Sequence, residues 1–287
     1  LSHLDETRYE GYLACGKGGI LDNEASSATR DRTSFVPCLI REVSPFHDLC
    51  ALLSLWIICI RIRPEIVHTH SSKAGVIGRW AAFFAGVPFV IHTFHGFGFN
   101  KFQNKLSRGV LVLAEKLTSK ITDLFIAVSR DNVEYAHSNG IGIGRNIEVI
   151  HSGIRRRRPS ADFDLNRIIP FNEGDKLIVN ISCLKPQKNP LHFVEVANII
   201  VNDYKHSGAK FILIGDGELK SAVSQTVKKY SLEKNFYLAG WRKDAYEILS
   251  RADIFMLTSL WEGLPRAMVE AMYYSKPVSY THLRAHE

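Results

Sequence analysis

The chain has 287 residues, of which 46% are hydrophobic and 23% charged, the composition of an ordinary globular protein with one large or two medium-sized domains. Its longest apolar run, residues 49–60, is well short of the roughly 20 residues that a membrane-spanning helix needs, so we expect a buried helix there. The net charge of +7 favours an acidic partner, namely a nucleotide, an anionic lipid surface or a nucleic acid.

The five cysteines are odd in number, widely scattered and without the spacing of a metal site. This pattern favours reduced thiols in a cytoplasmic protein over a disulfide framework. Basic residues do not interleave with aromatic residues in any recognised nucleic-acid-binding module, so we expect no nucleic acid partner.

Short apolar runs typical of strands alternate with helical patterns in the first half of the chain. The expected strands cover residues 9–15, 35–39, 65–70, 88–93, 124–128 and 147–150, and the longer helices cover 45–61, 74–85 and 100–120. Ser129 is a candidate N-cap for a further helix. This alternation predicts right-handed βαβ units and a parallel sheet, in an N-terminal domain over residues 1–153.

A basic run that ends in Pro159 and Ser160 breaks the alternation, and we expect a basic linker over residues 154–170. The alternation then resumes, with strands over 176–182, 210–214, 236–238 and 253–257 and helices over 190–204, 218–230, 245–250 and 265–274. A C-terminal domain is therefore expected over 171–287, although 279–287 do not continue the pattern. The predicted fold class is α/β, with two doubly wound, Rossmann-like domains.

The stretch from Glu262 to Glu270 carries the clearest chemistry, because a strand over 253–258 runs directly into it. Pro265 is expected in the first turn of a helix, whose unpaired amides and dipole favour an anion such as a diphosphate. Gly263 lets the backbone approach that anion, and the two glutamates lie where they can hold hydroxyl groups on either side of it. The pattern predicts a nucleotide-sugar site; the alternative is a surface helix with two solvated glutamates.

This arrangement of a glutamate, seven residues and a second glutamate resembles the donor-site motif of the family-4 retaining glycosyltransferases. Their GT-B fold has two domains facing each other across a cleft. The resemblance implies that Glu262 binds the transferred sugar, that amides around Leu264, Pro265 and Arg266 bind the phosphates, and that Glu270 binds the ribose. It covers roughly residues 61–278, and we expect both ends of the chain to be incomplete relative to the family.

A second segment of the C-terminal domain resembles the family's phosphate clamp. Lys188 matches a lysine that neutralises the diphosphate as the sugar leaves, whereas Cys183 stands where the family usually has an arginine. Lys185 or Arg266 could replace that arginine. The alternative for Lys188 is an ordinary solvated lysine at a helix start.

Two further turns of this domain are similar to donor-site elements of the family. Gly215 and Gly217 follow a strand and resemble the Gly-x-Gly turn at the edge of the cleft, although any strand-to-helix loop can carry such a turn. Trp241 and Arg242 resemble the segment that meets the nucleotide base. Stacking of Trp241 on that base and local packing of its ring both remain open.

Histidines gather after two strands of the N-terminal domain, where open α/β sheets bind their ligands. The first of the two loops resembles the family's acceptor side, which would comprise His68, His70, Ser71, Lys73 and Gly75. In the second loop, His95 matches a histidine that reaches the donor sugar, so we predict His95, Lys188 and Glu262 as the catalytic residues. The alternatives are structural histidines or a metal site, but the spacing is not the helical pair of a zinc site.

The helix predicted over 100–120 is amphipathic and basic. Its apolar stripe is expected to cover the sheet, and the alternative is contact with an anionic membrane that carries a lipid-linked acceptor. The stripe comprises Leu106, Val110, Leu113 and Leu117, and the basic residues are Lys101, Lys105, Arg108, Lys116 and Lys120. Residues 155–158 could add to that attraction or be a solvated linker.

The resemblance implies a retaining enzyme that transfers a hexosyl unit from a UDP-sugar to a glycan or lipid-linked acceptor, in surface polysaccharide synthesis. We expect it in the cytoplasm, either free or peripheral at the inner face of the membrane. No metal or other cofactor is expected, because helix amides and Lys188 would replace a divalent ion. The alternatives are a sugar-nucleotide epimerase of the same fold and a non-catalytic remnant that binds nucleotide sugars or membranes.

Overall fold

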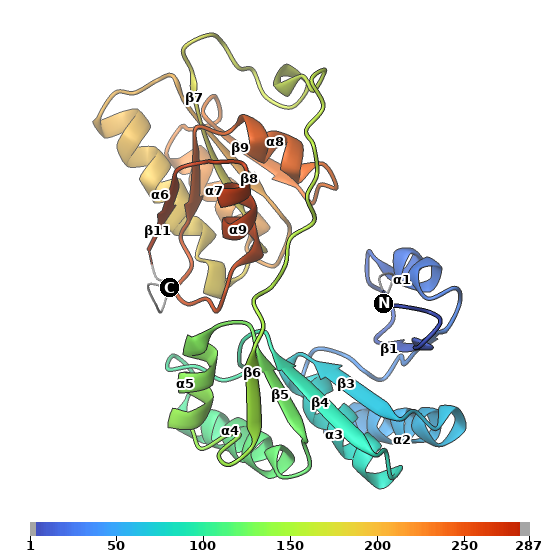
Figure 1. The fold of residues 1–287 in the computed structure, drawn as a ribbon. Helices are drawn as coiled ribbons and strands as arrows, with labels where there is room; N and C mark the ends of the chain where they lie inside the picture. Colours follow the sequence, from blue (N-terminus) through green and yellow to red (C-terminus); the bar gives the residue numbers. More distant parts are fainter. Residues whose placement is uncertain (1–3, 282–287) are drawn as a thin grey trace. The chain divides into compact units, whose positions relative to one another are not determined.

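A computed structural model describes residues 4–281 and divides the chain into two compact units, Leu1–Ile150 and His151–Glu287 (Figure 1). Each unit has its own parallel sheet and its own hydrophobic cores. Residues 151–170, which include the predicted linker, are grouped with the second unit. Of the atypical residues 279–287, those from 282 onward lie outside the described part of the chain.

The first unit is built on a four-stranded parallel sheet with the order β3-β4-β5-β6. Its strands are β3 (Ile66–His70), β4 (Phe89–Phe94), β5 (Leu124–Ala127) and β6 (Asn146–Val149). The helices of this unit are α1 (Asp22–Ala28), α2 (Pro45–Ile62), α3 (Ser72–Phe84), α4 (Lys105–Ser119) and α5 (Arg130–Ser138). Because each strand pairs with the next in sequence, right-handed connections place α3, α4 and α5 on one face of the sheet.

Two short strands, β1 (Leu13–Cys15) and β2 (Thr33–Phe35), pair with each other in a separate parallel ribbon. The sequence predicts longer strands, over 9–15 and 35–39. Val36, Cys38 and Leu39 instead turn away from the ribbon and pack with residues of α2 and α3. The side chains that suggested a strand are therefore used in a helix-packing core.

The structure also pairs Cys38 with Cys50 in a disulfide, with their Cα atoms 6.0 Å apart. The sequence interpretation of all five cysteines as reduced thiols is therefore wrong for these two. Their separation of 12 residues gave no sign of the pairing, which arises because the turn after β2 lies against the first turns of α2. The other three cysteines are free.

A buried ion pair determines which face of α4 points inward. Arg79 of α3 donates from Nη2 to Glu115 Oε2 at 2.6 Å and from Nη1 to Thr122 at 3.3 Å. Beside it, Trp80 Nε1 donates to Thr118 Oγ1 at 3.0 Å. Burial lowers the pKa of Arg79 and raises that of Glu115, whereas the attraction between the two charges opposes both shifts.

Two helices of this unit expose apolar faces that the sequence predicts to be buried. On α2 only Ala51 and Leu55 are buried, and the outward face comprises Phe46, Leu49, Leu53, Ile57 and Ile60. On α4 the predicted sheet-covering stripe points outward, because the polar face with Glu115 is the one anchored to α3. Within the described residues, α2 is the one helix long and apolar enough to cross a membrane, a test that core helices of soluble proteins also pass.

The second unit has a five-stranded parallel sheet with the order β11-β10-β7-β8-β9. Its strands are β7 (Lys176–Ile181), β8 (Ala209–Ile214), β9 (Phe236–Gly240), β10 (Ile254–Leu257) and β11 (Val278–Tyr280). Its α-helices are α6 (Pro190–Asn198), α7 (Lys220–Lys229), α8 (Ala245–Arg251) and α9 (Arg266–Tyr273), with short turns of 3₁₀ helix at η1 (Leu165–Arg167) and η2 (Pro186–Lys188) and of π-helix at η3 (Ile199–Asp203). The order runs outward in both directions from β7, so this sheet is doubly wound.

Successive residues of the central strands enter two different cores. Leu177 and Val179 pack with α8 and α9 on one face, whereas Ile178 packs with α6 and α7 on the other. This is the alternation of a strand that is buried on both sides, and it explains the nearly continuous apolar run of β7.

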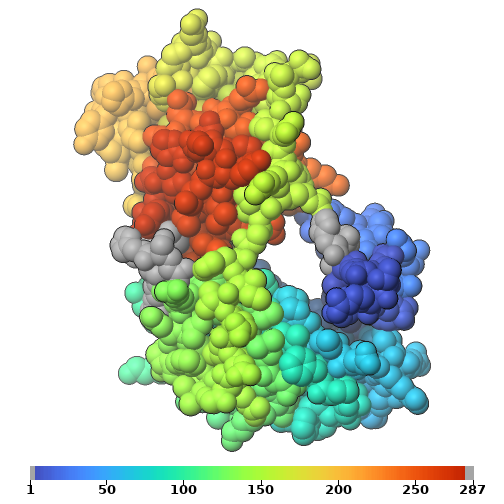
Figure 2. All heavy atoms as spheres, viewed as in Figure 1, coloured from blue at the N-terminus to red at the C-terminus, as the bar shows by residue number. Residues whose placement is uncertain are grey.

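The chain before η1 lies along the second unit rather than free in solvent (Figure 2). The Arg157 guanidinium lies 4.9 Å from the centre of the Tyr246 ring and donates to the Lys243 carbonyl at 3.2 Å. The Ser160 amide donates to Glu247 Oε2 at 2.9 Å, and the Tyr274 hydroxyl donates to the Arg157 carbonyl at 2.9 Å. Arg157 is therefore used in packing.

Candidate functional site

The candidate donor site lies at the point where the strand order of the second sheet reverses. The chain leaves β7 toward β8 on one side, and it leaves β10 toward β11 on the other. The loops after β7 and β10 therefore diverge at their carboxyl ends, which is where open α/β sheets bind ligands. Lys188 follows β7 and Glu262 follows β10, so the topology brings together the two residues that the sequence predicts as catalytic in this unit.

Lys188 and Glu262 form a direct ion pair between Nζ and Oε1. The same carboxylate oxygen accepts a hydrogen bond from Ser259 Oγ at 2.6 Å. The side chains are 18% and 7% exposed, so the pair is largely shielded from water while the lysine keeps some access to solvent. A shielded cation and a hydrogen-bonded carboxylate are suited to a diphosphate and to sugar hydroxyls.

Side chain and backbone hydrogen bonds hold the two loops against each other. Thr258 Oγ1 donates to the Asn189 carbonyl at 3.0 Å, the Leu260 amide donates to the Gln187 carbonyl at 2.8 Å, and Gln187 Nε2 donates to the Trp261 carbonyl at 3.0 Å. Asn189 has a φ of 46°, a left-handed conformation that asparagine tolerates better than most residues. These contacts fix the positions of the ion pair.

The helix that follows Glu262 begins one residue later than predicted. Pro265 is the buried N-cap, with φ −73° and ψ 114°, and α9 starts at Arg266. The first backbone hydrogen bond of the helix is donated by the Met268 amide to the Pro265 carbonyl at 3.0 Å. The amides before Met268 therefore have no hydrogen-bond acceptor within the helix. Glu270 is partly buried and lies one turn further along, about 6 Å from Arg266 at ~1.5 Å per residue.

Gly215 and Gly217 are required by the packing of the loop after β8. Their φ values are +143° and +156°, which side-chain-bearing residues rarely adopt. A Cβ atom on Gly215 would lie 1.9 Å from the Ser182 carbonyl oxygen, and one on Gly217 would lie 2.6 Å from the Leu184 carbonyl oxygen. The two glycines therefore let this loop lie directly on the loop that carries Lys188.

The segment after β9 joins the same edge, because the Gly215 amide donates to the Gly240 carbonyl at 2.8 Å. Trp241 is 45% exposed, which leaves a ring face available to a base. Arg242 makes two bonds to Asp244, from Nε at 2.8 Å and from Nη2 at 2.7 Å, and these bonds lower the pKa of Asp244. The Arg242 guanidinium is thus already paired.

The histidines of the first unit form a chain of contacts at the carboxyl ends of β3 and β4. His68 Nε2 lies 2.7 Å from Thr93 Oγ1, and His70 Nδ1 lies 3.1 Å from His95 Nε2. The rings of His68 and His70 are 4.3 Å apart at their centres, and those of His70 and His95 are 5.3 Å apart. His92 instead points into the core, with Nδ1 2.8 Å from a threonine hydroxyl.

The electrostatics of this cluster favour neutral rings at His68 and His70. Burial and the charges of the neighbouring histidines lower the pKa of His70 to about 4, and the same two causes lower the pKa of His68. Neutral imidazoles can donate to and accept from sugar hydroxyls. The described residues contain no group of three or more His, Cys, Asp or Glu side chains placed to hold a metal ion.

The remaining acceptor-side residues have clear structural partners. Lys73 forms an ion pair with Asp48 of α2 at 2.5 Å and also donates to the Glu42 carbonyl. The Gly75 amide donates to the Ser71 carbonyl at 2.8 Å, and a Cβ atom at Gly75 would lie 2.4 Å from the ring of the buried histidine. Ser71 has a φ of 62° at the start of α3. These contacts hold the loop that follows β3.

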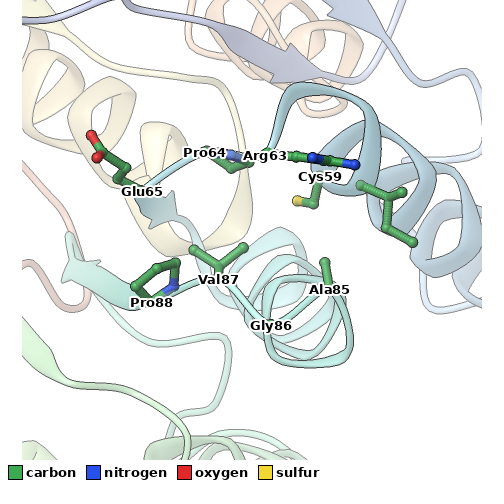
Figure 3. A pocket seen from close by; sticks show the side chains of 9 residues that line it. Cys59, Arg63, Pro64, Glu65, Ala85, Gly86, Val87 and Pro88 are labelled. Atoms are coloured by element: carbon green, nitrogen blue, oxygen red, sulfur yellow. The ribbon is translucent and has the colours of Figure 1, made fainter.

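A pocket of about 340 Å³ lies in the first unit at the opposite ends of β3 and β4 (Figure 3). It is lined by the last turn of α2, which includes Cys59, and by the connections that lead into the two strands and end at Glu65 and Pro88. The histidine loops lie at the carboxyl ends of these strands, where parallel sheets bind ligands, and the pocket is therefore separate from them.

Sequence reasoning missed several polar partners of the predicted residues, three of which lie at the strand ends. Ser259 supports Glu262, Gln187 joins the two donor loops, and Thr93 contacts His68. Thr93 was open to prediction, because a threonine in register with the histidines of the neighbouring strand lies at the same sheet edge. Ser259 and Gln187 are ordinary loop residues whose partners appear only when β7 and β10 are adjacent.

Two family models match the chain. One described as Glycosyltransferase Family 4 matches residues 3–158, and one described as Glycosyl transferases group 1 matches residues 162–282. The first match ends and the second begins near residue 160, within the stretch that joins the sheets of the two units.

Similar proteins include a curated enzyme of Escherichia coli, the UDP-Gal:alpha-D-GlcNAc-diphosphoundecaprenol alpha-1,3-galactosyltransferase. It is 33% identical over 96% of this chain and 72% of its own length. The capsular polysaccharide biosynthesis glycosyltransferase CapM of Staphylococcus aureus is 23% identical over 85% of this chain and 65% of its own. The solved structure of Anabaena Alr3699/HepE in complex with UDP and glucose gives a TM-score of 0.71 at 17% identity, covering 93% of this chain and 71% of that one.

Proposed function

This chain belongs to the family-4 glycosyltransferases, which have the GT-B fold, and we propose that it transfers a hexosyl unit from a UDP-sugar to a glycan or lipid-linked acceptor with retention of configuration. The supporting observation is the Lys188–Glu262 pair at the switch point of the second sheet. The E. coli relative is named for a diphosphoundecaprenol-linked sugar. Its name supports the proposal that this chain uses a lipid-linked acceptor and works at the cytoplasmic face of a membrane.

In the proposed reaction, donor binding separates the ion pair. The Lys188 ammonium moves from Glu262 to the diphosphate, where it neutralises the charge that develops as the sugar–phosphate bond breaks. Glu262 keeps the hydrogen bond from Ser259 and accepts further hydrogen bonds from hydroxyl groups of the sugar. The free amides at the start of α9 bind the phosphate oxygens, and Glu270 binds the ribose.

The acceptor hydroxyl then attacks on the face from which the diphosphate leaves, and its proton passes to an oxygen of the leaving diphosphate. We assign no side chain as a covalent nucleophile. His95, whose ring nitrogen lies near that of His70, is proposed to contact the sugar through its imidazole. Lys188 and the α9 amides are proposed to take the role of a divalent metal, so the reaction is expected to proceed without one.

Calorimetric titration with UDP, with and without EDTA, tests the donor site. We expect binding that does not change with the chelator. Glu270→Ala should weaken it about 10- to 100-fold, the range for a hydrogen bond to a charged group. Glu233→Ala, at an exposed glutamate of the same unit, is the control. If Glu270→Ala bound UDP with unchanged affinity, the proposed contact between Glu270 and the ribose would be refuted.

Product analysis tests the transfer itself. UDP-galactose is the first donor to try, because it is the donor in the name of the E. coli relative. An acceptor-dependent product whose anomeric configuration, measured by nuclear magnetic resonance, matches that of the donor supports the proposal. Inversion, or conversion of the donor without any acceptor, contradicts it.

A further inference from the structure

The outer face of α4 combines an apolar stripe with a row of cations. Leu106, Val110, Leu113 and Leu117 fall within a narrow arc, because residues three and four apart lie on the same side of a helix with ~3.6 residues per turn. All four are exposed, and Leu106 is 80% exposed. Phe102, in the turn before the helix, is exposed as well.

The stripe points outward because the opposite side of α4 is anchored. Glu115 lies nine residues after Leu106, about half a turn around the helix from it at ~3.6 residues per turn, and it is held by the buried Arg79. Thr118 is fixed by Trp80 on the same side. The exposure therefore follows from specific contacts, and a rotation that buried the stripe would leave the Arg79 and Glu115 charges unpaired in the core.

On α4 itself, cations border this stripe and no acidic residue is exposed. Between Glu65 and Glu115 the sequence contains no aspartate or glutamate, and Glu115 itself is buried against Arg79. Lys105, Lys116 and Lys120 lie along one flank of the stripe by helical spacing, and all three are exposed. The α4 surface is thus apolar in its centre and positive at its edge.

A second helix of the same layer also exposes an apolar face. The helices α2, α3 and α4 are neighbours in one layer (Figure 1), and the outward face of α2 carries the five exposed apolar residues from Phe46 to Ile60. Apolar surface gathered on one layer is a mark of an interaction site in a soluble protein.

We propose that the outer face of α4, centred on its apolar stripe, docks on an anionic lipid membrane. An amphipathic helix with leucines at its centre and lysines at its edge binds lipid by burying the apolar side chains among the acyl chains while the cations meet the phosphates. A second copy of this chain is a poorer partner, because two faces of the same positive charge would repel each other. The proposal does not depend on the proposed transferase activity, since docking needs no donor.

Co-sedimentation of the full chain with vesicles tests the proposal. We expect binding to equimolar phosphatidylglycerol and phosphatidylcholine vesicles, much weaker binding to pure phosphatidylcholine, and a loss of binding as salt rises. The double variant Leu106→Ser with Leu113→Ser should bind at least tenfold more weakly. The control is Ile143→Ser, at an exposed apolar residue in a loop of the same unit.

A charge variant separates the two parts of the mechanism. Lys105→Gln with Lys116→Gln should weaken binding roughly 10- to 30-fold, because each basic residue near an anionic surface contributes about a factor of five. Lys228→Gln with Lys229→Gln removes the same charge from exposed positions of the second unit and should leave binding unchanged. UDP titration of all four variants should match the unmodified chain, which keeps a failure of docking distinct from a failure of the donor site.

Three results would overturn the proposal. One is equal binding of the stripe variant and the unmodified chain to anionic vesicles. Another is equal binding to neutral and anionic vesicles. The third is a dimer, seen by analytical ultracentrifugation, that Leu106→Ser with Leu113→Ser dissociates, because the face would then belong to a second copy.

Discussion

Replacing Lys188 by glutamine tests the central pair of the candidate site. The change removes the cation but leaves the Glu262 carboxylate, 7% exposed, with the Ser259 hydroxyl as its remaining partner in the pair's network. Breaking a fully buried ion pair costs about 3–5 kcal/mol, and because the lysine is 18% exposed we expect about 1–3 kcal/mol here. Urea unfolding followed by circular dichroism measures this loss.

The same variant should bind UDP about 10- to 100-fold more weakly, since a hydrogen bond to a charged group contributes about 1.5–3 kcal/mol. Adding Glu262→Gln removes the unpaired carboxylate, so the double variant should regain stability without regaining UDP affinity. The divergence of the two readouts separates the structural role of Lys188 from its role in binding.

Lys176 provides the matched control, because it pairs with Asp253 at 3.0 Å in the same unit but is 70% exposed. Lys176→Gln should cost at most about 1 kcal/mol and should not change UDP affinity. A coupling energy between Lys188 and Glu262 below about 0.5 kcal/mol would show that the pair is not formed in solution. Unchanged UDP affinity in Lys188→Gln would refute its role at the diphosphate.

Three further predictions follow from the geometry. Gly215→Ala should lower the free energy of unfolding of the second unit by about 2–4 kcal/mol in urea, because residue 215 has a positive φ and the new Cβ atom would lie 1.9 Å from a carbonyl oxygen. Gly153→Ala is the control and should leave the free energy of unfolding unchanged, because a Cβ atom there meets open space. Equal losses of stability in the two variants would contradict the loop packing. His70 should titrate near pH 4 by nuclear magnetic resonance, and since its pKa is lowered from 6.5 on folding, its contribution to stability should be present above pH 6.5 and lost between 6.5 and about 4; a normal titration would refute the crowded cluster. Arg79→Met should lower the free energy of unfolding by about 3–5 kcal/mol, because it leaves the Glu115 carboxylate unpaired in the core. Arg79→Met with Glu115→Leu should lower it distinctly less. A double variant as unstable as the single one would exclude the unpaired carboxylate as the cause.

The sequence predicted the parts of the fold that rest on period and handedness. Alternating apolar runs and helices predicted the parallel sheets, and the strand that runs into Glu262 predicted the strand-to-helix loop of the candidate donor site. Those features are local, so one chain segment contains all the information. The adjacency of β7 and β10, which brings Lys188 to Glu262, depends on strand order, and the family resemblance supplied the expectation that the two belong to one site.

The sequence failed where polar contacts between segments decide orientation. The period of α4 was correct, yet the stripe from Leu106 to Leu117 faces solvent because Arg79 holds Glu115 inside. A helix with apolar residues on one side and a buried ion pair on the other cannot be oriented from its pattern alone, since hydrophobicity favours the opposite choice. The disulfide of Cys38 was missed for the same reason, because its partner becomes a neighbour only through the turn after β2.

The pairing of Lys188 with Glu262 also bears on how the proposed site behaves between reaction cycles. A shielded lysine facing a diphosphate site and a shielded carboxylate facing a sugar site would each be costly if left unpaired in the empty protein. Their mutual contact satisfies both charges, and the hydrogen bond from Ser259 keeps the carboxylate in place when the lysine leaves. In the proposed reaction, donor binding exchanges this ionic contact for two sets of contacts, to phosphate and to sugar. UDP without its sugar would break the ion pair but would give the Glu262 carboxylate no new hydrogen bonds. The intact nucleotide sugar is therefore expected to bind more tightly than UDP alone.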